Sequence, residues 1–129
     1  MLQIFNRECL LQAKINKPIY EEMHPGKQFR IVVGSLGLGS KGYFVYGNKK
    51  GRIGCEDGDF HTWIEDEEGL IYDCFTPHLH WLALINKEHV FMEEGEFFSL
   101  SRRAAKKRGL HYVPATAAGQ AAVVNWCAA

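Results

Sequence analysis

The sequence predicts an α+β fold in which an N-terminal helix packs on an antiparallel sheet of about four to five strands. An apolar stripe with helical spacing comes first, and it consists of Leu11, Ile15, Ile19 and Met23. Short runs rich in Val, Ile, Phe and Tyr follow, separated by glycine-rich turns, which is the pattern typical of strands. A length of 129 residues and a hydrophobic content of 47% suit one domain, at residues 1–114, followed by an Ala-rich C-terminal tail at residues 115–129.

The first helix is expected to begin near Asn6, whose side chain can cap the first turn. Cys9 then occupies the third helical position. Pro18 lacks the N–H that a helix interior requires, so we expect a kink or a break near Lys17. The segment His24-Pro25-Gly26 ends the helix.

Strands are expected at residues 27–36 and 43–46, because both runs are rich in β-branched and aromatic residues. A glycine loop over residues 34–42 joins them, and a polar loop over residues 47–58 leads to the next strand.

The part of the chain after the hairpin is expected to be mixed. Residues 79–85 suggest a short helix or turn. Ser99 or Ser101 caps a second helix that runs to Arg108, and a last strand follows at residues 110–113. The Ala-rich tail either stays loose or docks as an extra element.

Residues 61–73 predict a β-hairpin, and its register decides whether His61 and Asp73 share a face. A two-residue loop would separate them. A three-residue loop that ends with Gly69 in the left-handed region pairs Trp63 with Asp73 and leaves His61 diagonal to Asp73. Diagonal neighbours lie about 7–8 Å apart by backbone, within reach of an imidazole and a carboxylate. We therefore predict the three-residue loop and a contact between His61 and Asp73.

Composition excludes several classes of function. The formal net charge is zero, which gives no general attraction to nucleic acid. No apolar run approaches the length of about 20 residues that a membrane span needs. Arg7 and Glu8 leave no apolar core for a signal peptide, so we expect a cytoplasmic protein. The four cysteines are widely spaced and are interpreted as free thiols. No cofactor is expected.

Cys9, His61 and Asp73 are the candidate catalytic residues. An imidazole held by a carboxylate is a ready general base. A cysteine in the first turn of a helix gains thiolate character from the free amides and from the helix dipole. The thiolate would attack an amide or ester carbonyl, and the result would be hydrolysis or acyl transfer. The Cys9 backbone amide is the expected oxyanion donor, with Trp63 Nε1 as the second candidate.

The order of these motifs resembles the transglutaminase-like (papain-like) cysteine hydrolase superfamily between about Cys9 and Pro114. The segments that carry the resemblance are Arg30-Ile31-Val32-Val33-Gly34-Ser35-Leu36-Gly37, His61-Thr62-Trp63-Ile64-Glu65, Gly69-Leu70-Ile71-Tyr72-Asp73 and Gly109-Leu110-His111-Tyr112-Val113-Pro114-Ala115. The resemblance implies that Cys9 is the nucleophile, His61 the base and Asp73 the residue that orients it. It also implies a peptide or a small acyl or amide compound as substrate, and we expect Trp63 to contact that substrate.

The alternative hypothesis is a catalytically inactive transglutaminase-like domain that binds a peptide or protein through the hairpin. The family usually places helices before the nucleophile, and only eight residues precede Cys9 here. We therefore expect part of the sheet to be exposed and a homodimer to cover it.

Competing sites are less consistent with the sequence. His78, His80 and His89 could bind zinc together with His61, but their spacing is not diagnostic, and we predict no metal site. Cys55 is an alternative nucleophile whose acidic neighbours would raise its pKa.

Three further patterns favour structural roles. The glycine loop lacks the Gly-Lys-Ser/Thr ending of a phosphate-binding loop. The basic run at residues 102–108 suits the last turn of a helix and a solvated face. The acidic run at residues 65–68 is expected to be an exposed turn.

Overall fold

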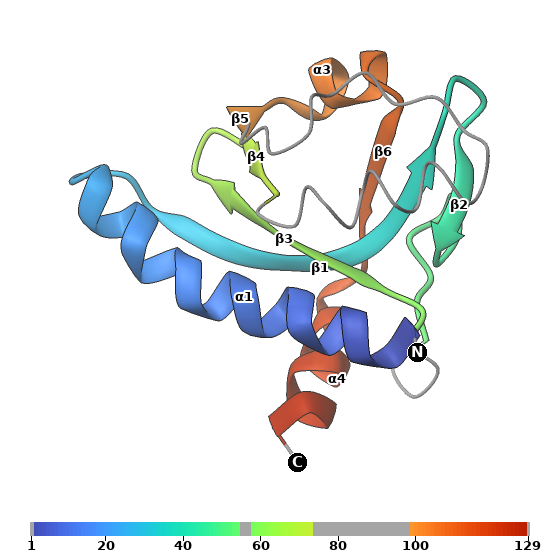
Figure 1. The fold of residues 1–129 in the computed structure, drawn as a ribbon, viewed down its shortest axis with the longest axis horizontal. Helices are drawn as coiled ribbons and strands as arrows, with labels where there is room; N and C mark the ends of the chain where they lie inside the picture. The colour runs from blue at the N-terminus through green and yellow to red at the C-terminus, as the bar shows by residue number, and fades with distance from the viewer. Residues whose placement is uncertain (1, 55–57, 74–98, 129) are drawn as a thin grey trace.

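The computed structural model describes residues 2–54, 58–73 and 99–128, and the side chains within residues 9–125 of those ranges (Figure 1). Helix α1 (Leu2–Met23) is followed by the strands β1 (Phe29–Leu38), β2 (Tyr43–Tyr46), β3 (His61–Asp66), β4 (Ile71–Tyr72) and β5 (Ser99–Leu100). The chain then forms α3 (Arg102–Lys107), β6 (Leu110–Pro114) and α4 (Ala117–Ala128). The α+β prediction is confirmed.

The sheet is built around the long strand β1. Strand β1 pairs with β2, β3 and β6, β3 also pairs with β4, and β4 pairs with β5, and all of these pairings are antiparallel. It has six strands, more than expected, because the short strand β5 pairs with β4.

Strands β2 and β3 lie end to end along the same side of β1. Gly34 pairs with His61 of β3 and also with a residue of β6, so β3 and β6 occupy opposite sides of β1. Leu36 pairs with Tyr46 of β2 and also with β6, which puts β2 on the side of β3. The end of β2 therefore meets the start of β3, and the rings of Tyr46 and His61 stack there.

Helices cover the two faces of the sheet differently. Figure 1 shows α1 and α4 on one side of the curved β1 and α3 on the other. Buried residues of α1 and α4, including Leu10 and Val123, pack against Val33 and Phe60. The opposite, concave face holds a second core of Val32, Leu36, Leu38, Tyr46, Trp63, Ile71, Ala105, Leu110 and Tyr112. Because side chains alternate along a strand, His61 shares the concave face with Trp63.

A kink or break was expected near Pro18, but the helix is not interrupted there. Helix α1 runs as one helix from Leu2 to Met23 with Pro18 inside it. The sheet contacts the helix on both sides of the proline. Ala13 is fully buried before it, and the ring of Tyr20 packs at a tilt against that of Tyr72 after it, with ring centroids 5.3 Å apart. Pro18 itself lies on the exposed side of the helix. Packing thus outweighs the one backbone hydrogen bond that proline removes.

Strand β1 extends further than expected and includes Gly34 and Gly37, which the sequence suggested were part of a loop. A Cβ atom at Gly34 would lie 2.2 Å from the Val113 carbonyl oxygen and 2.8 Å from the Trp63 ring. Glycine is needed here because the backbone of β6 and an indole ring both pack against β1.

The C-terminal tail forms helix α4 and docks on the sheet. The Gln120 side chain accepts a hydrogen bond from the Val33 backbone N–H at 3.2 Å, and Val123 is fully buried. Of the two outcomes that the sequence left open for this segment, docking is the one observed.

Candidate functional site

The hairpin of β3 and β4 has the predicted register. Ile64 pairs with Tyr72 and Glu65 with Ile71, and the Asp66 backbone N–H donates to the Leu70 carbonyl at 3.1 Å. Gly69 has a φ of +83°, the left-handed conformation that the three-residue loop requires. The predicted loop is confirmed, and this register puts His61 and Asp73 on one face.

The predicted contact between His61 and Asp73 is present. His61 Nε2 lies 2.7 Å from Asp73 Oδ2, and both side chains are almost completely buried. An ionised carboxylate can only accept, so Nε2 carries the proton in this hydrogen bond. The Tyr112 hydroxyl donates to the same oxygen, also at 2.7 Å. Two donors on one buried oxygen hold the carboxylate in place beside the imidazole.

The other nitrogen of His61 has different surroundings. Within the described part of the chain, His61 Nδ1 is buried and has no hydrogen-bond partner. The ring lies between aromatic neighbours: it stacks on Tyr46 with an interplanar angle of 6° and a centroid separation of 6.0 Å, and Trp63 lies 6.1 Å away. When Nε2 carries the proton, a neutral imidazole has its lone pair on Nδ1. A buried acceptor is therefore available on the side away from Asp73.

Cys9 lies on α1 in a position that differs from the prediction. The helix begins at Leu2 instead of Asn6, so Cys9 is in its second turn and beyond the region of strongest helix-dipole effect. Its backbone N–H points along the helix toward the preceding turn, so it is not the free oxyanion donor that we expected. The thiol itself is buried, with 2% exposure.

Cys9 lies on the part of α1 that packs beside the start of β3, because its neighbour Leu10 shares a core cluster with Phe60, the residue before His61. Burial first, and an electrostatic interaction with Cys9 second, raise the pKa of Tyr46. Tyr46 in turn stacks on His61. No hydrogen bond joins Cys9 to His61 Nδ1 in this structure. The structure thus brings His61 and Asp73 into direct contact, whereas Cys9 forms no hydrogen bond with the second ring nitrogen of His61.

Trp63 is core, and the buried ring presents no surface to a substrate in this structure. It has no exposed area, its centroid lies 4.9 Å from that of Tyr112, and Nε1 donates to Glu65 Oε2 at 2.9 Å. Trp63 Nε1 is therefore already used and is not a free oxyanion donor. Glu65 also pairs with Arg30 and Arg102, at 3.6 and 3.3 Å.

The acidic run at residues 65–68 is only partly an exposed turn, which corrects the expectation. Glu65 and Asp66 are buried, with 1% and 2% exposure, and only the next two residues are exposed. The basic run likewise includes a specific contact, from Arg102 to Glu65. Helix α3 is capped by Ser101, one of the two predicted caps, whose hydroxyl accepts from the Ala104 N–H.

Asp66 organises the far end of the hairpin. Burial disfavours its charge, but hydrogen bonds donated by Leu70, Tyr72, Glu68 and Lys27 outweigh burial and lower the pKa of this carboxyl below its usual value of 3.8.

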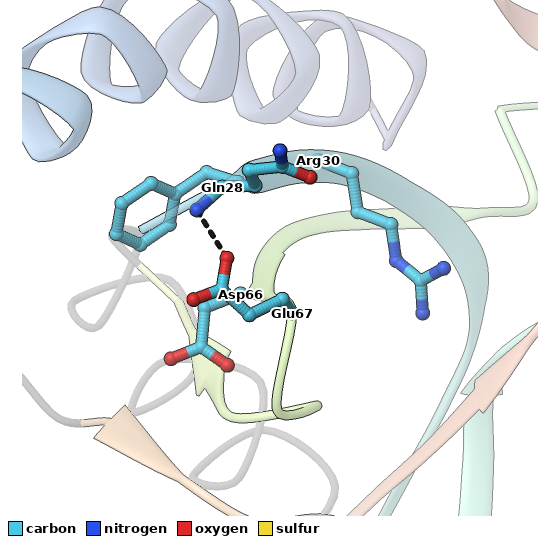
Figure 2. Close-up of a pocket in the computed structure, with 5 residues that line it drawn as sticks. Gln28, Arg30, Asp66 and Glu67 are labelled. Atoms are coloured by element: carbon cyan, nitrogen blue, oxygen red, sulfur yellow. Dashed lines mark hydrogen bonds between the residues drawn. The ribbon is translucent and has the colours of Figure 1, made fainter. Parts of the chain in front are cut away.

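A pocket of about 300 Å³ lies beside Asp66 (Figure 2). It is lined by Gln28, Phe29, Arg30, Asp66 and Glu67.

This pocket is separate from the candidate triad. Asp66 is five residues along β3 from His61, or about 16 Å at the usual rise per residue. In Figure 2 the Gln28 backbone N–H donates to Glu67, and the Arg30 side chain extends away from the two acids. The polar groups that line it are thus largely used in closing the hairpin against β1.

Tyr112 and Tyr46 were not anticipated as site residues. Both belong to short strands whose apolar pattern gave no reason to expect a polar role. A signal was present for Tyr112, since a buried tyrosine hydroxyl normally requires a partner, but the sequence could not say which carboxylate would lie opposite.

Four remaining candidates lie outside the described residues. These are Cys55, His78, His80 and His89. Within the described ranges, no three His, Cys, Asp or Glu side chains converge as a metal site would require. None of the helices in these ranges combines the length and the apolar character needed to cross a membrane.

Comparison with known proteins gives a fold and no activity. No family model and no curated protein matches the sequence. A solved structure with a similar fold is a crystal structure described as that of a genomics target. It has a TM-score of 0.56 and 14% sequence identity, and the match covers 97% of this chain and 67% of that chain. At this identity the similarity concerns the fold alone.

Proposed function

We propose that the protein is a small cysteine hydrolase or acyltransferase, similar to the transglutaminase-like superfamily, that acts on an amide or ester of a peptide or small molecule in the cytoplasm. Cys9 is the proposed nucleophile, His61 the general base and Asp73 the residue that orients His61. One observation supports this most strongly: Asp73 holds His61 Nε2 at 2.7 Å while the opposite ring nitrogen is buried without a partner. A purely structural histidine would be expected to have both nitrogens satisfied.

The proposed chemistry follows from the tautomer that Asp73 imposes. Nδ1 accepts the Cys9 thiol proton, and the thiolate sulfur forms a bond to the acyl carbon. As the tetrahedral intermediate collapses, the bond from carbon to the leaving amine or alcohol breaks, and the leaving group takes the proton from His61. Water or a second amine then attacks the thioester, giving up a proton to His61, and the thiolate leaves. Asp73 stabilises the imidazolium in both halves of the reaction.

The proposal requires Cys9 Sγ to approach His61 Nδ1. The helix that carries Cys9 packs beside the start of β3, since Leu10 and Phe60, the neighbours of Cys9 and His61 in the sequence, belong to one core cluster. Catalytic hydrogen bonds are often long or absent without substrate and shorten in the complex. The proposal therefore includes a rearrangement on substrate binding that brings the Cys9 thiol and His61 Nδ1 together.

Alkylation kinetics test this assignment. Iodoacetamide at neutral pH, followed by peptide mass spectrometry, reports the rate at Cys9, with Cys55, Cys74 and Cys127 in the same molecule as reference thiols. We expect Cys9 to react fastest despite its burial, and we expect His61→Gln to slow it at least tenfold without changing the reference thiols. If Cys9 reacts no faster than the references, or at a rate independent of His61, the proposed triad is wrong.

The alternative is an inactive domain that binds a peptide or protein, and the burial of the site favours it. His61, Asp73 and Cys9 all have 2% exposure or less, so no substrate contacts them in this conformation. In that case the pair of His61 and Asp73 would have a structural role, since the hydrogen bond from Tyr112 to Asp73 connects the hairpin to β6. The same alkylation experiment separates the two functions, since this alternative predicts a slow, His61-independent rate at Cys9.

A further inference from the structure

Helix α1 carries an apolar stripe on the side that faces away from the sheet. Its members are the large side chains Leu11, Ile15, Ile19 and Met23, which are 58%, 52%, 48% and 65% exposed. The buried side of the same helix is formed by Leu10 and Ala13, at 2% and 0%. The stripe that the sequence showed therefore lies on the side of the helix opposite its buried residues. Four exposed apolar residues in one row mark a surface that a partner covers.

The spacing of the stripe selects a packing geometry. Its members are four residues apart, so they form one of the ridges that run at a shallow angle across a helix surface. Two helices whose ridges of this kind interdigitate cross at about −50°, whereas a coiled coil requires an average spacing of about 3.5 residues. The stripe therefore fits another helix with the same kind of ridge, and α1 of a second copy has one.

A second row of exposed residues adds charge complementarity. Lys14, Pro18 and Glu22 are also spaced by four and flank the stripe on one side. When two copies of α1 pack antiparallel about a two-fold axis near Pro18, this flank meets the same flank of the partner. Lys14 of each copy then lies near Glu22 of the other, which makes two symmetric ion pairs. A parallel arrangement would bring this flank against Gln12, Asn16 and Tyr20, which carry no charge.

We propose that the partner of this surface is a second copy of the chain, bound through antiparallel α1 helices in a two-fold symmetric dimer. The interface is isologous, with Ile15 of one copy against Ile19 of the other. It differs from the dimer that the sequence suggested, which would have covered the sheet. A single pair of helices buries less than a standard interface of about 1,600 Å², so we expect a Kd on the order of 10 μM. This proposal is independent of the catalytic one.

Sedimentation equilibrium on the whole chain tests the dimer between about 1 and 300 μM, a range that brackets the expected Kd. We expect the average mass to rise from monomer to dimer. The double substitution Ile15→Glu/Ile19→Glu should weaken association at least 30-fold. The matched control Tyr43→Glu/Val124→Glu, at residues that are 57% and 41% exposed on other elements, should leave it unchanged. Circular dichroism verifies that each variant is folded.

Charge reversal tests the antiparallel orientation. Lys14→Glu alone and Glu22→Lys alone should each weaken the dimer about tenfold, because two ion pairs become two repulsions, and the double reversal should restore it to within about threefold. A monomer at every concentration, or a dimer that tolerates Ile15→Glu/Ile19→Glu, would overturn the proposal. A dimer that the double reversal fails to restore would overturn the antiparallel arrangement.

Discussion

His61 combines two different environments in one side chain. Nε2 is held by Asp73, and Asp73 is held in turn by the Tyr112 hydroxyl, whereas Nδ1 is buried with no partner among the described residues. Leaving a buried polar atom unsatisfied costs about 1–3 kcal/mol, so this arrangement opposes stability. A catalytic role would account for keeping it, because the unsatisfied nitrogen is the one that a general base uses.

The Tyr112 hydroxyl is expected to stabilise the fold through Asp73. Tyr112→Phe removes one charge-assisted hydrogen bond on a buried carboxylate and should lower the free energy of unfolding by about 1.5–3 kcal/mol, as measured by urea denaturation. Tyr43→Phe is the matched control, since Tyr43 is 57% exposed, and it should change stability by less than about 0.5 kcal/mol. Equal effects of the two substitutions would show that the Tyr112 contact does not matter.

At the scale of elements, the hairpin of β3 and β4 depends on one glycine conformation. A Cβ at Gly69 would have no atom within 4 Å, so any cost of a side chain there comes from the φ of +83° and from nothing else. Gly69→Ala should cost about 1–2 kcal/mol, and Gly69→Asn less, because asparagine tolerates the left-handed region.

Chemical denaturation of both Gly69 variants measures this difference. Gly119→Ala is the control, because Gly119 lies within helix α4 and has no positive φ, so that helix propensity, which favours alanine by about 0.5–1 kcal/mol, opposes a close approach of 3.3 Å between the new Cβ and Thr116 Oγ1. Equal losses for Gly69→Ala and Gly69→Asn would argue against the left-handed loop.

Asp66 makes the same hairpin sensitive to acid. Its folded pKa lies below the unfolded value, so its stabilisation is fully present above about pH 5 and is lost as the pH falls below about 4 and through the folded pKa. Comparing urea midpoints at pH 6 and pH 3 should therefore show a smaller drop for Asp66→Asn than for the unsubstituted protein. Glu68→Gln, at an exposed neighbour, should leave the drop unchanged. A drop that Asp66→Asn does not reduce would contradict this role.

Local elements were predictable from the sequence, and long-range ones were not. The loop ending at Gly69 fixes its own register within a few residues, so the contact between His61 and Asp73 followed from turn geometry alone. The continuity of α1 through Pro18 was missed because it depends on packing against β1 and β4. The partners of Asp73 and Glu65, Tyr112 and Arg102, are 39 and 37 residues away along the chain, and no local pattern encodes such distances.

For the whole molecule, β1 determines how the parts of the site meet. Because β2 and β3 share one side of β1, their ends bring Tyr46 beside His61, and α1 reaches the same junction from the convex face. The apolar stripe of α1 stays exposed on the side of the helix away from the sheet. One helix therefore carries both the proposed nucleophile and the proposed dimer surface.

The ionisation of Cys9 is the sharpest test of the proposed triad, because its measurement does not depend on reagent access to a buried thiol. The ultraviolet absorbance of the thiolate, taken as the difference between the protein and Cys9→Ser, gives the titration of this residue as a function of pH. A triad predicts a midpoint well below the usual value of about 8.5, and a return to that value or above in His61→Gln. A midpoint at or above about 8.5 that is the same in both proteins would contradict the account.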